Sequence, residues 1–157
     1  MTQTQQQNLT LTVSRRYHAT RERVFDAWTD PEIMKQWFSP EGVTNPAIDV
    51  DLRVGGTYRV EMLTPDGRRP VAVGTYQEIT RPERLVFTWA WEDEADDAHT
   101  GQTLVTVEFL EHGDETEVVV THAGFAGEEG RKGHEDGWTG CLVCLDAVLS
   151  DEGMLQR

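Results

Sequence analysis

Two cysteines and five histidines are the side chains whose types suggest metal, redox or acid–base chemistry. Cys141 and Cys144 form a CxxC motif, but the sequence has no second CxxC and no closely spaced histidine pair, and zinc needs four ligands. Redox activity favours a cysteine at a helix N-terminus, whereas both cysteines fall inside an apolar stripe of helical period. We expect two reduced, buried thiols and no metal or cofactor, with redox or metal binding as the alternative.

Among the histidines, strand alternation directs His122 toward the interior. An inward histidine could act as a general base, and Tyr76 is the best partner that the sequence offers. A hydrogen-bonded histidine in the core or at a cavity mouth is the interpretation we favour. Hydrolase and nucleotide-dependent functions have no support, because the sequence lacks a Gly-x-Ser-x-Gly motif and a phosphate-binding loop. We assign no catalytic residue.

Charge is the clearest bias of the 157 residues, since 28 acidic and 14 basic side chains give a net charge of −14. Such a surface repels phosphate, so we expect neither nucleic acid nor an anionic membrane as a partner. No apolar stretch reaches the length of a membrane span, and the polar start lacks a secretory pattern, so we expect a cytoplasmic protein. The acidic run from Glu92 to Asp97 lacks calcium-loop spacing and is expected to be a solvated loop.

Hydrophobic periodicity predicts the elements that position these residues. Alternation predicts a strand from Leu9 to Tyr17, and Thr20 and Asp30 are suited to cap two short helices that follow it. From residue 46 to 122, alternating apolar residues and turn signals predict several strands. Apolar spacings of three and four over residues 138–149 predict a long final helix.

Glycines within this last segment are unusual, because each glycine in a helix interior costs about 1 kcal/mol relative to alanine. A loop over residues 127–134, with the helix starting after it, accounts for Gly133 alone. Close approach of helix and sheet, or space for a ligand, accounts for Gly137 and Gly140. Gly153 is expected to end the helix.

The order of elements predicts an α+β fold in which a curved antiparallel sheet grips the final helix. Five segments in the same order also resemble a known family: YHATRERVFDAWTDPEIMKQWFSPEG, DLRVGGTYRVEM, GTYQEITRPERLVFTWAW, THAGF and GHEDGWTGCLVCL. Over about residues 10 to 150 the chain resembles the SRPBCC superfamily. Its most similar branch is homologous to the C-terminal domain of the activator of heat-shock protein 90 ATPase.

This resemblance implies the helix-grip fold, also called START-like. In that fold a curved antiparallel β-sheet wraps around a long C-terminal helix, two short helices follow the first strand, and a cavity often lies between sheet and helix. We expect a flexible tail over residues 1–8 and a single domain over residues 9–152. The superfamily includes lipid carriers, hormone receptors, polyketide cyclases and co-chaperones, so the fold alone does not choose a function.

Alternation in the strands and the helical stripe direct nine residues toward the expected cavity: Met62, Tyr76, Phe87, Trp89, Phe109, His122, Trp138, Cys141 and Leu145. An apolar lining with few polar groups is typical of a small-molecule site. We therefore predict non-catalytic binding of a small hydrophobic or amphipathic ligand. The alternatives are a filled core, a co-chaperone-like module that binds a chaperone, and a cyclase-type enzyme that uses the same cavity. The sequence leaves the oligomeric state open between a monomer and a homodimer.

Overall fold

A computed structural model describes residues 9–39, 42–92, 103–125 and 127–155. The elements in chain order are β1 (Leu9–Tyr17), α2 (Arg21–Thr29), α3 (Pro31–Trp37), β2 (Ile48–Val50), β3 (Thr57–Glu61), β4 (Val71–Thr80), β5 (Arg84–Trp91), β6 (Thr103–His112), β7 (Glu115–Phe125) and α4 (Glu128–Leu155). The tail expected over residues 1–8 and the acidic loop expected after Glu92 lie outside the described residues.

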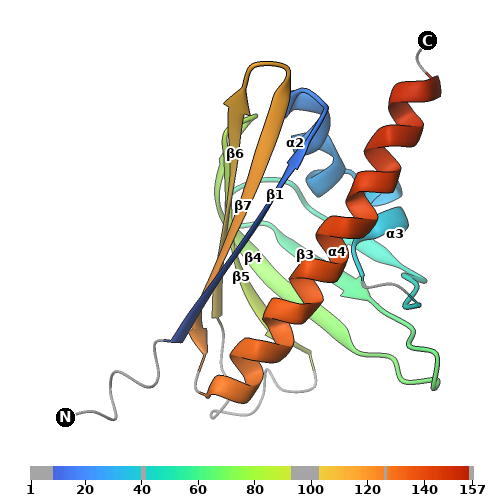
Figure 1. Cartoon of the computed structure of the whole chain (residues 1–157). Helices are drawn as coiled ribbons and strands as arrows, with labels where there is room; N and C mark the ends of the chain where they lie inside the picture. The colour runs from blue at the N-terminus through green and yellow to red at the C-terminus, as the bar shows by residue number, and fades with distance from the viewer. Residues whose placement is uncertain (1–8, 40–41, 93–102, 126, 156–157) are drawn as a thin grey trace.

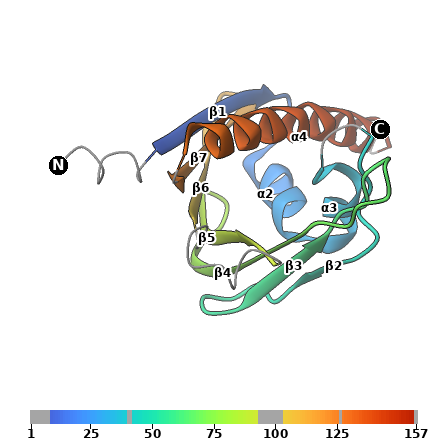
Figure 2. The same cartoon turned by 90° about the horizontal axis from the view of Figure 1, so that it is seen from below.

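Seven strands form one antiparallel sheet in the order β1-β7-β6-β5-β4-β3-β2. Strands β2 to β7 each pair with their neighbour in the chain, and β1 returns to pair with β7. The sheet curves around α2 and α3, and the long α4 crosses its open side (Figures 1 and 2). This arrangement confirms the predicted helix-grip fold.

The two short helices begin at the predicted caps. The Thr20 hydroxyl accepts a hydrogen bond from the Arg23 backbone N–H at 3.3 Å, and the Asp30 carboxylate accepts one from the Glu32 N–H at 3.0 Å. Each cap satisfies a backbone donor that lacks a partner within the helix. Local signals in the sequence therefore determine where the two short helices begin.

The core lies between the concave face of the sheet and the three helices. Alternate residues of β6 and β7 are buried as predicted: Val105, Val107, Phe109, Val118, Val120 and His122. Strand β5 is buried on both faces, because Val86, Thr88 and Ala90 are shielded as well as Leu85 and Phe87. No helix of the described residues is both long and apolar enough to cross a membrane.

Helix α4 is longer than one of the sequence interpretations allowed. A loop over residues 127–134 was an explanation for Gly133, and this explanation is wrong, because α4 begins at Glu128. Arg131 supports this first part, with contacts to Glu128 at 2.6 Å and to Glu135 at 2.8 Å. Ion pairs three and four residues apart stabilise a helix and offset part of the glycine penalty. Gly153, expected to end the helix, lies inside it.

Candidate functional site

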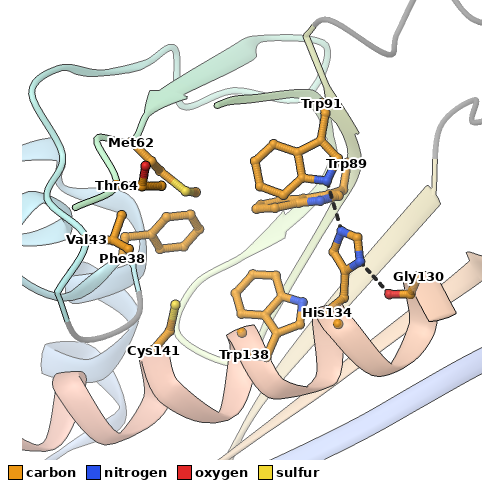
Figure 3. Close-up of a pocket in the computed structure, with 12 residues that line it drawn as sticks. Phe38, Val43, Met62, Thr64, Trp89, Trp91, Gly130, His134, Trp138 and Cys141 are labelled. Atoms are coloured by element: carbon orange, nitrogen blue, oxygen red, sulfur yellow. Dashed lines mark hydrogen bonds between the residues drawn. The ribbon is translucent and has the colours of Figure 1, made fainter. Parts of the chain in front are cut away.

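A pocket of about 370 Å³ lies between the N-terminal half of α4, strand β5 and the segments around β3 (Figure 3). Twelve of the described residues line it: Phe38, Val43, Met62, Thr64, Trp89, Trp91, Gly130, Gly133, His134, Gly137, Trp138 and Cys141. None of these side chains is a carboxylate, an ammonium or a guanidinium. The pocket is therefore an aromatic and aliphatic space with two titratable side chains, His134 and Cys141.

One side of the pocket is formed by glycines of α4. Gly130, Gly133 and Gly137 are spaced by three and four residues, which places them on one face of the helix. A Cβ atom added at any of the three would meet no heavy atom within 4 Å. Close approach of helix and sheet therefore does not explain Gly133 or Gly137, whereas open space at the pocket does.

Aromatic rings from β5, from α4 and from the residue after α3 line the pocket and contact one another. The ring centroids of Trp89 and Trp138 are 5.3 Å apart, and Phe38 lies 5.8 Å from Trp138 and 6.3 Å from Trp89. Such ring pairs are worth about 0.5–1.5 kcal/mol beyond their buried area. These three rings therefore support one another around the open space of the pocket.

His134 joins α4 to the end of β5. The indole Nε1–H of Trp91 donates to His134 Nε2 at 3.1 Å, so this nitrogen carries a lone pair. The other nitrogen, Nδ1, then carries the proton and donates to the Gly130 carbonyl at 2.7 Å (Figure 3). Both ring nitrogens are used within the protein, and this geometry belongs to a neutral imidazole.

His122 lies deeper and joins three elements through a chain of hydrogen bonds. Trp138 Nε1–H donates to His122 Nδ1 at 3.0 Å, and His122 Nε2 lies 2.6 Å from the Thr103 hydroxyl. That hydroxyl donates to the Trp89 carbonyl at 3.0 Å. Burial, with a smaller contribution from His134, lowers the pKa of His122 from 6.5 to about 3. The ring is therefore neutral, with its proton on Nε2.

Both cysteines are free thiols, as expected, but the expectation that both are buried is wrong for Cys144. Cys141 is buried at the pocket, and Cys144 is partly exposed on the same helix. Burial raises the pKa of Cys141 far above its ordinary value, and Cys144 raises it further, so the thiol is protonated. Among the described residues, no group of three or more histidine, cysteine, aspartate or glutamate side chains is placed to hold a metal ion.

Residues 18–150 match the family of activator of Hsp90 ATPase homolog 1-like proteins. The chain belongs to this family. Among proteins with curated descriptions, none matches this member of the family.

Solved structures agree with this assignment. A protein from Nitrosomonas europaea is 25% identical with a TM-score of 0.78, and the match covers 93% of this chain and 97% of that chain. One from Chromobacterium violaceum is 26% identical with a TM-score of 0.80, covering 89% and 96%. An AHSA1 protein from Silicibacter pomeroyi is 28% identical with a TM-score of 0.80, covering 92% and 99%. The AHSA1-like fold therefore extends over almost the whole chain.

The AHSA1-like structure divides the nine residues predicted for the site into three groups. Four line the pocket: Met62, Trp89, Trp138 and Cys141. Two line a separate void of about 10 Å³: Tyr76 and Phe87. Phe38, which is not one of the nine, lines both spaces. The remaining three are core residues that line neither space: Phe109, His122 and Leu145. Ligand binding by any of the nine stays a prediction.

Sequence reasoning missed pocket residues from loops, from the end of β5 and from the start of α4. Val43 lies in a segment without hydrophobic periodicity, and no local signal could have found it. Thr64 continues the alternation of Val60 and Met62, but its polar side chain falls outside a search for apolar residues. Trp91 shares its predicted strand face with Trp89, so alternation was enough to include it. His134 falls at the end of the segment that the sequence allowed as a loop, whereas the structure places it inside α4.

Proposed function

We propose that this AHSA1-like chain binds a small apolar molecule in the α4–β5 pocket and performs no covalent chemistry on it. The observation that carries the proposal is the glycine face of α4. Gly133 and Gly137 each reduce helix stability by about 1 kcal/mol relative to alanine, yet neither is required by a neighbouring atom. Keeping the space open accounts for their presence.

The size and lining of the pocket support the same function. Small-molecule sites typically enclose about 300–1,000 Å³ and are mainly hydrophobic and aromatic, and this pocket has a volume of about 370 Å³. Three tryptophans and a phenylalanine supply most of its aromatic surface: Phe38, Trp89, Trp91 and Trp138. These rings offer a large contact area to an apolar ligand.

A cyclase-type function finds less support in the geometry. The acid–base pair suggested by the sequence is His122 with Tyr76, and neither residue lines the pocket. Both nitrogens of His122 are engaged in hydrogen bonds, and its pKa of about 3 leaves it a very weak base at neutral pH. A binding protein agrees better with these observations than an enzyme does.

A co-chaperone-like function is the second candidate, and the family match favours it. It predicts that addition of the protein changes the ATPase rate of an Hsp90-type chaperone. Ligand binding and chaperone contact use different assays, so the two functions are separable. An unchanged ATPase rate over a range of protein concentrations would remove this candidate.

The proposal is tested by titration with N-phenyl-1-naphthylamine, a neutral probe whose fluorescence rises in apolar surroundings. We expect saturable binding of one probe per chain and energy transfer from the pocket tryptophans. Gly137→Ala adds a methyl group to the open space and is expected to weaken binding severalfold, and Gly137→Leu is expected to weaken it by more than about tenfold.

The unfolding free energy of each variant shows whether weaker binding comes from a filled pocket or from a damaged fold. Gly137→Ala is expected to raise the unfolding free energy by about 0.5–1 kcal/mol, because alanine favours the helix. Thr139→Ala is the matched control, because Thr139 is exposed on α4 and lies outside the pocket lining. This control is expected to leave binding unchanged. Equal binding by wild type and Gly137→Leu would refute the pocket as the site.

A further inference from the structure

The residues that line the pocket restrict its ligand not only to apolar molecules but also to uncharged ones. Among the described residues that line the pocket, no side chain carries a formal charge, because His134 is neutral by its hydrogen bonds and the pKa of Cys141 is raised by burial. An ionised group inside the pocket would therefore find no counter-charge among these described side chains. Burying an unpaired charge is among the most unfavourable changes in a protein interior.

Hydrogen-bonding groups of the lining are also occupied by the protein itself. Trp91 donates to His134, and Trp138 donates to His122. The Thr64 hydroxyl donates to the Asp66 carboxylate and accepts from the Arg68 backbone N–H at 3.0 Å. A polar ligand group would have to break one of these bonds to gain Trp91, Trp138 or Thr64 as a partner.

Trp89 is the one lining tryptophan whose Nε1–H is buried without an acceptor. In the close-up this nitrogen lies on the side of the ring near Trp91 and His134, while the carbon edge of the ring extends toward Met62 and Phe38 (Figure 3). Trp89 therefore presents hydrocarbon to the interior of the pocket. The Cys141 thiol, a weak donor, is the remaining polar group there.

The net charge of the chain, like the lining of the pocket, disfavours anionic ligands. The chain carries a net charge of −14, and its field disfavours the approach of anions, most strongly at low ionic strength. The local and long-range effects differ in one testable respect. Salt weakens the repulsion between exposed charges, but it does not supply a partner for a charge that is buried.

We propose that the pocket selects neutral, largely hydrocarbon molecules and excludes anionic amphiphiles, such as fatty acids, whose charged group would have to enter it. This inference rests on the proposed function and narrows the ligand class. Each hydrogen-bonding group buried without a partner weakens binding about 10- to 100-fold, and an ionised group weakens it more. A ligand with one polar end would keep that end outside the pocket.

Two fluorescent probes with the same aromatic skeleton test this selection. N-phenyl-1-naphthylamine is neutral, and 8-anilino-1-naphthalenesulfonate is the same skeleton with one sulfonate. We expect the neutral probe to bind at least about 100-fold more tightly. The preference is expected to persist in 0.5 M sodium chloride (about 4 Å screening length), because it arises from the lining. Gly137→Leu, which fills the pocket, serves as the control for the location of binding.

The outcomes separate this inference from the proposed function. Tight binding of the neutral probe alone, abolished in Gly137→Leu, supports both. Equal binding of the two probes, still sensitive to Gly137→Leu, overturns the selection and leaves the pocket as the site. A preference that disappears in high salt also overturns the inference, because surface repulsion then explains it. Failure of both probes to bind would overturn the selection and the proposed function together.

Discussion

His122 is fully buried, and its two ring nitrogens have opposite roles. Nδ1 accepts from Trp138 and Nε2 faces the Thr103 hydroxyl, so a proton added to Nδ1 would point at an N–H donor. The folded protein therefore binds this proton much less readily than the unfolded chain, in which histidine has its ordinary pKa. The residue holds two pocket walls together in its neutral form.

Acid should consequently destabilise the fold through His122. Its pKa is about 3 in the folded protein against an ordinary value of 6.5, so the unfolded state gains a proton first as the pH falls below 6.5. We expect the unfolding free energy to fall by about 2 kcal/mol between pH 7 and pH 5 from this residue. Urea denaturation at several pH values measures the slope.

A substitution assigns this slope to one residue. His122→Gln removes the titrating group and keeps a side chain that can donate and accept hydrogen bonds, so it is expected to be less stable at pH 7 but to lose most of the slope between pH 7 and 5. His112→Gln is the control, because His112 is at the surface and bonds to Glu117. An unchanged slope in His122→Gln would show that other groups cause the acid sensitivity.

At the scale of elements, local patterns predicted the strands and the short helices, because their signals lie within a few residues. Thr20 and Asp30 cap the helices where the spacing predicted. The extent of α4 was less accessible, since helix propensity argues against Gly130 and Gly133 while the ion pairs of Arg131 favour the helix. The two ion pairs offset only part of the penalty of the two glycines, so tertiary packing must supply the rest, and the sequence alone does not show that packing.

The pocket was harder to predict than the fold, because periodicity gives the direction of a side chain but not what it meets. Cys141 and Leu145 lie on the same face of α4, four residues apart, yet Cys141 lines the pocket and Leu145 is packed in the core. His122 and Phe109 likewise point inward into filled space. Whether an inward face is open depends on the separation of α4 and the sheet, which long-range packing determines.

Phe38, immediately after α3, separates the pocket from the smaller void beside Tyr76 and Phe87. Phe38→Ala is expected to join the two spaces and to favour a larger neutral probe, Nile red, over N-phenyl-1-naphthylamine by severalfold relative to wild type. Fluorescence titration of both probes gives this ratio. A stability loss of about 3–5 kcal/mol is expected as well, so folding is checked by circular dichroism.

Phe109→Ala is the control for that experiment. Phe109 is equally buried but lines neither space, so its truncation should cost similar stability without changing the ratio of the two affinities. If both variants shifted the ratio alike, general loosening of the core would explain the effect. If neither did, Phe38 would not be the partition that limits the size of the ligand.

Over the whole molecule, the acidic excess is not balanced by ion pairing. Most lysine and arginine side chains of the described residues lie within 4.0 Å of a carboxylate, for example Arg59 with Glu61 and Glu92. Because acidic residues outnumber basic ones by 28 to 14, pairing of the cations leaves a surplus of negative charge. Exposed pairs contribute little individually, whereas the surplus acts across the surface as mutual repulsion.

This imbalance predicts that sodium chloride stabilises the protein. Salt weakens both the exposed ion pairs and the repulsion among unpaired carboxylates, and the net charge of −14 makes the repulsion the larger effect. We expect the unfolding free energy to rise by about 1 kcal/mol, or the Tm by about 2–4 °C, between 10 and 300 mM sodium chloride (about 30 to 6 Å screening length). Chloride is preferred to sulfate, because sulfate strengthens hydrophobic burial by itself. A Tm that falls with salt would instead show that the ion pairs outweigh the repulsion of the surplus charge.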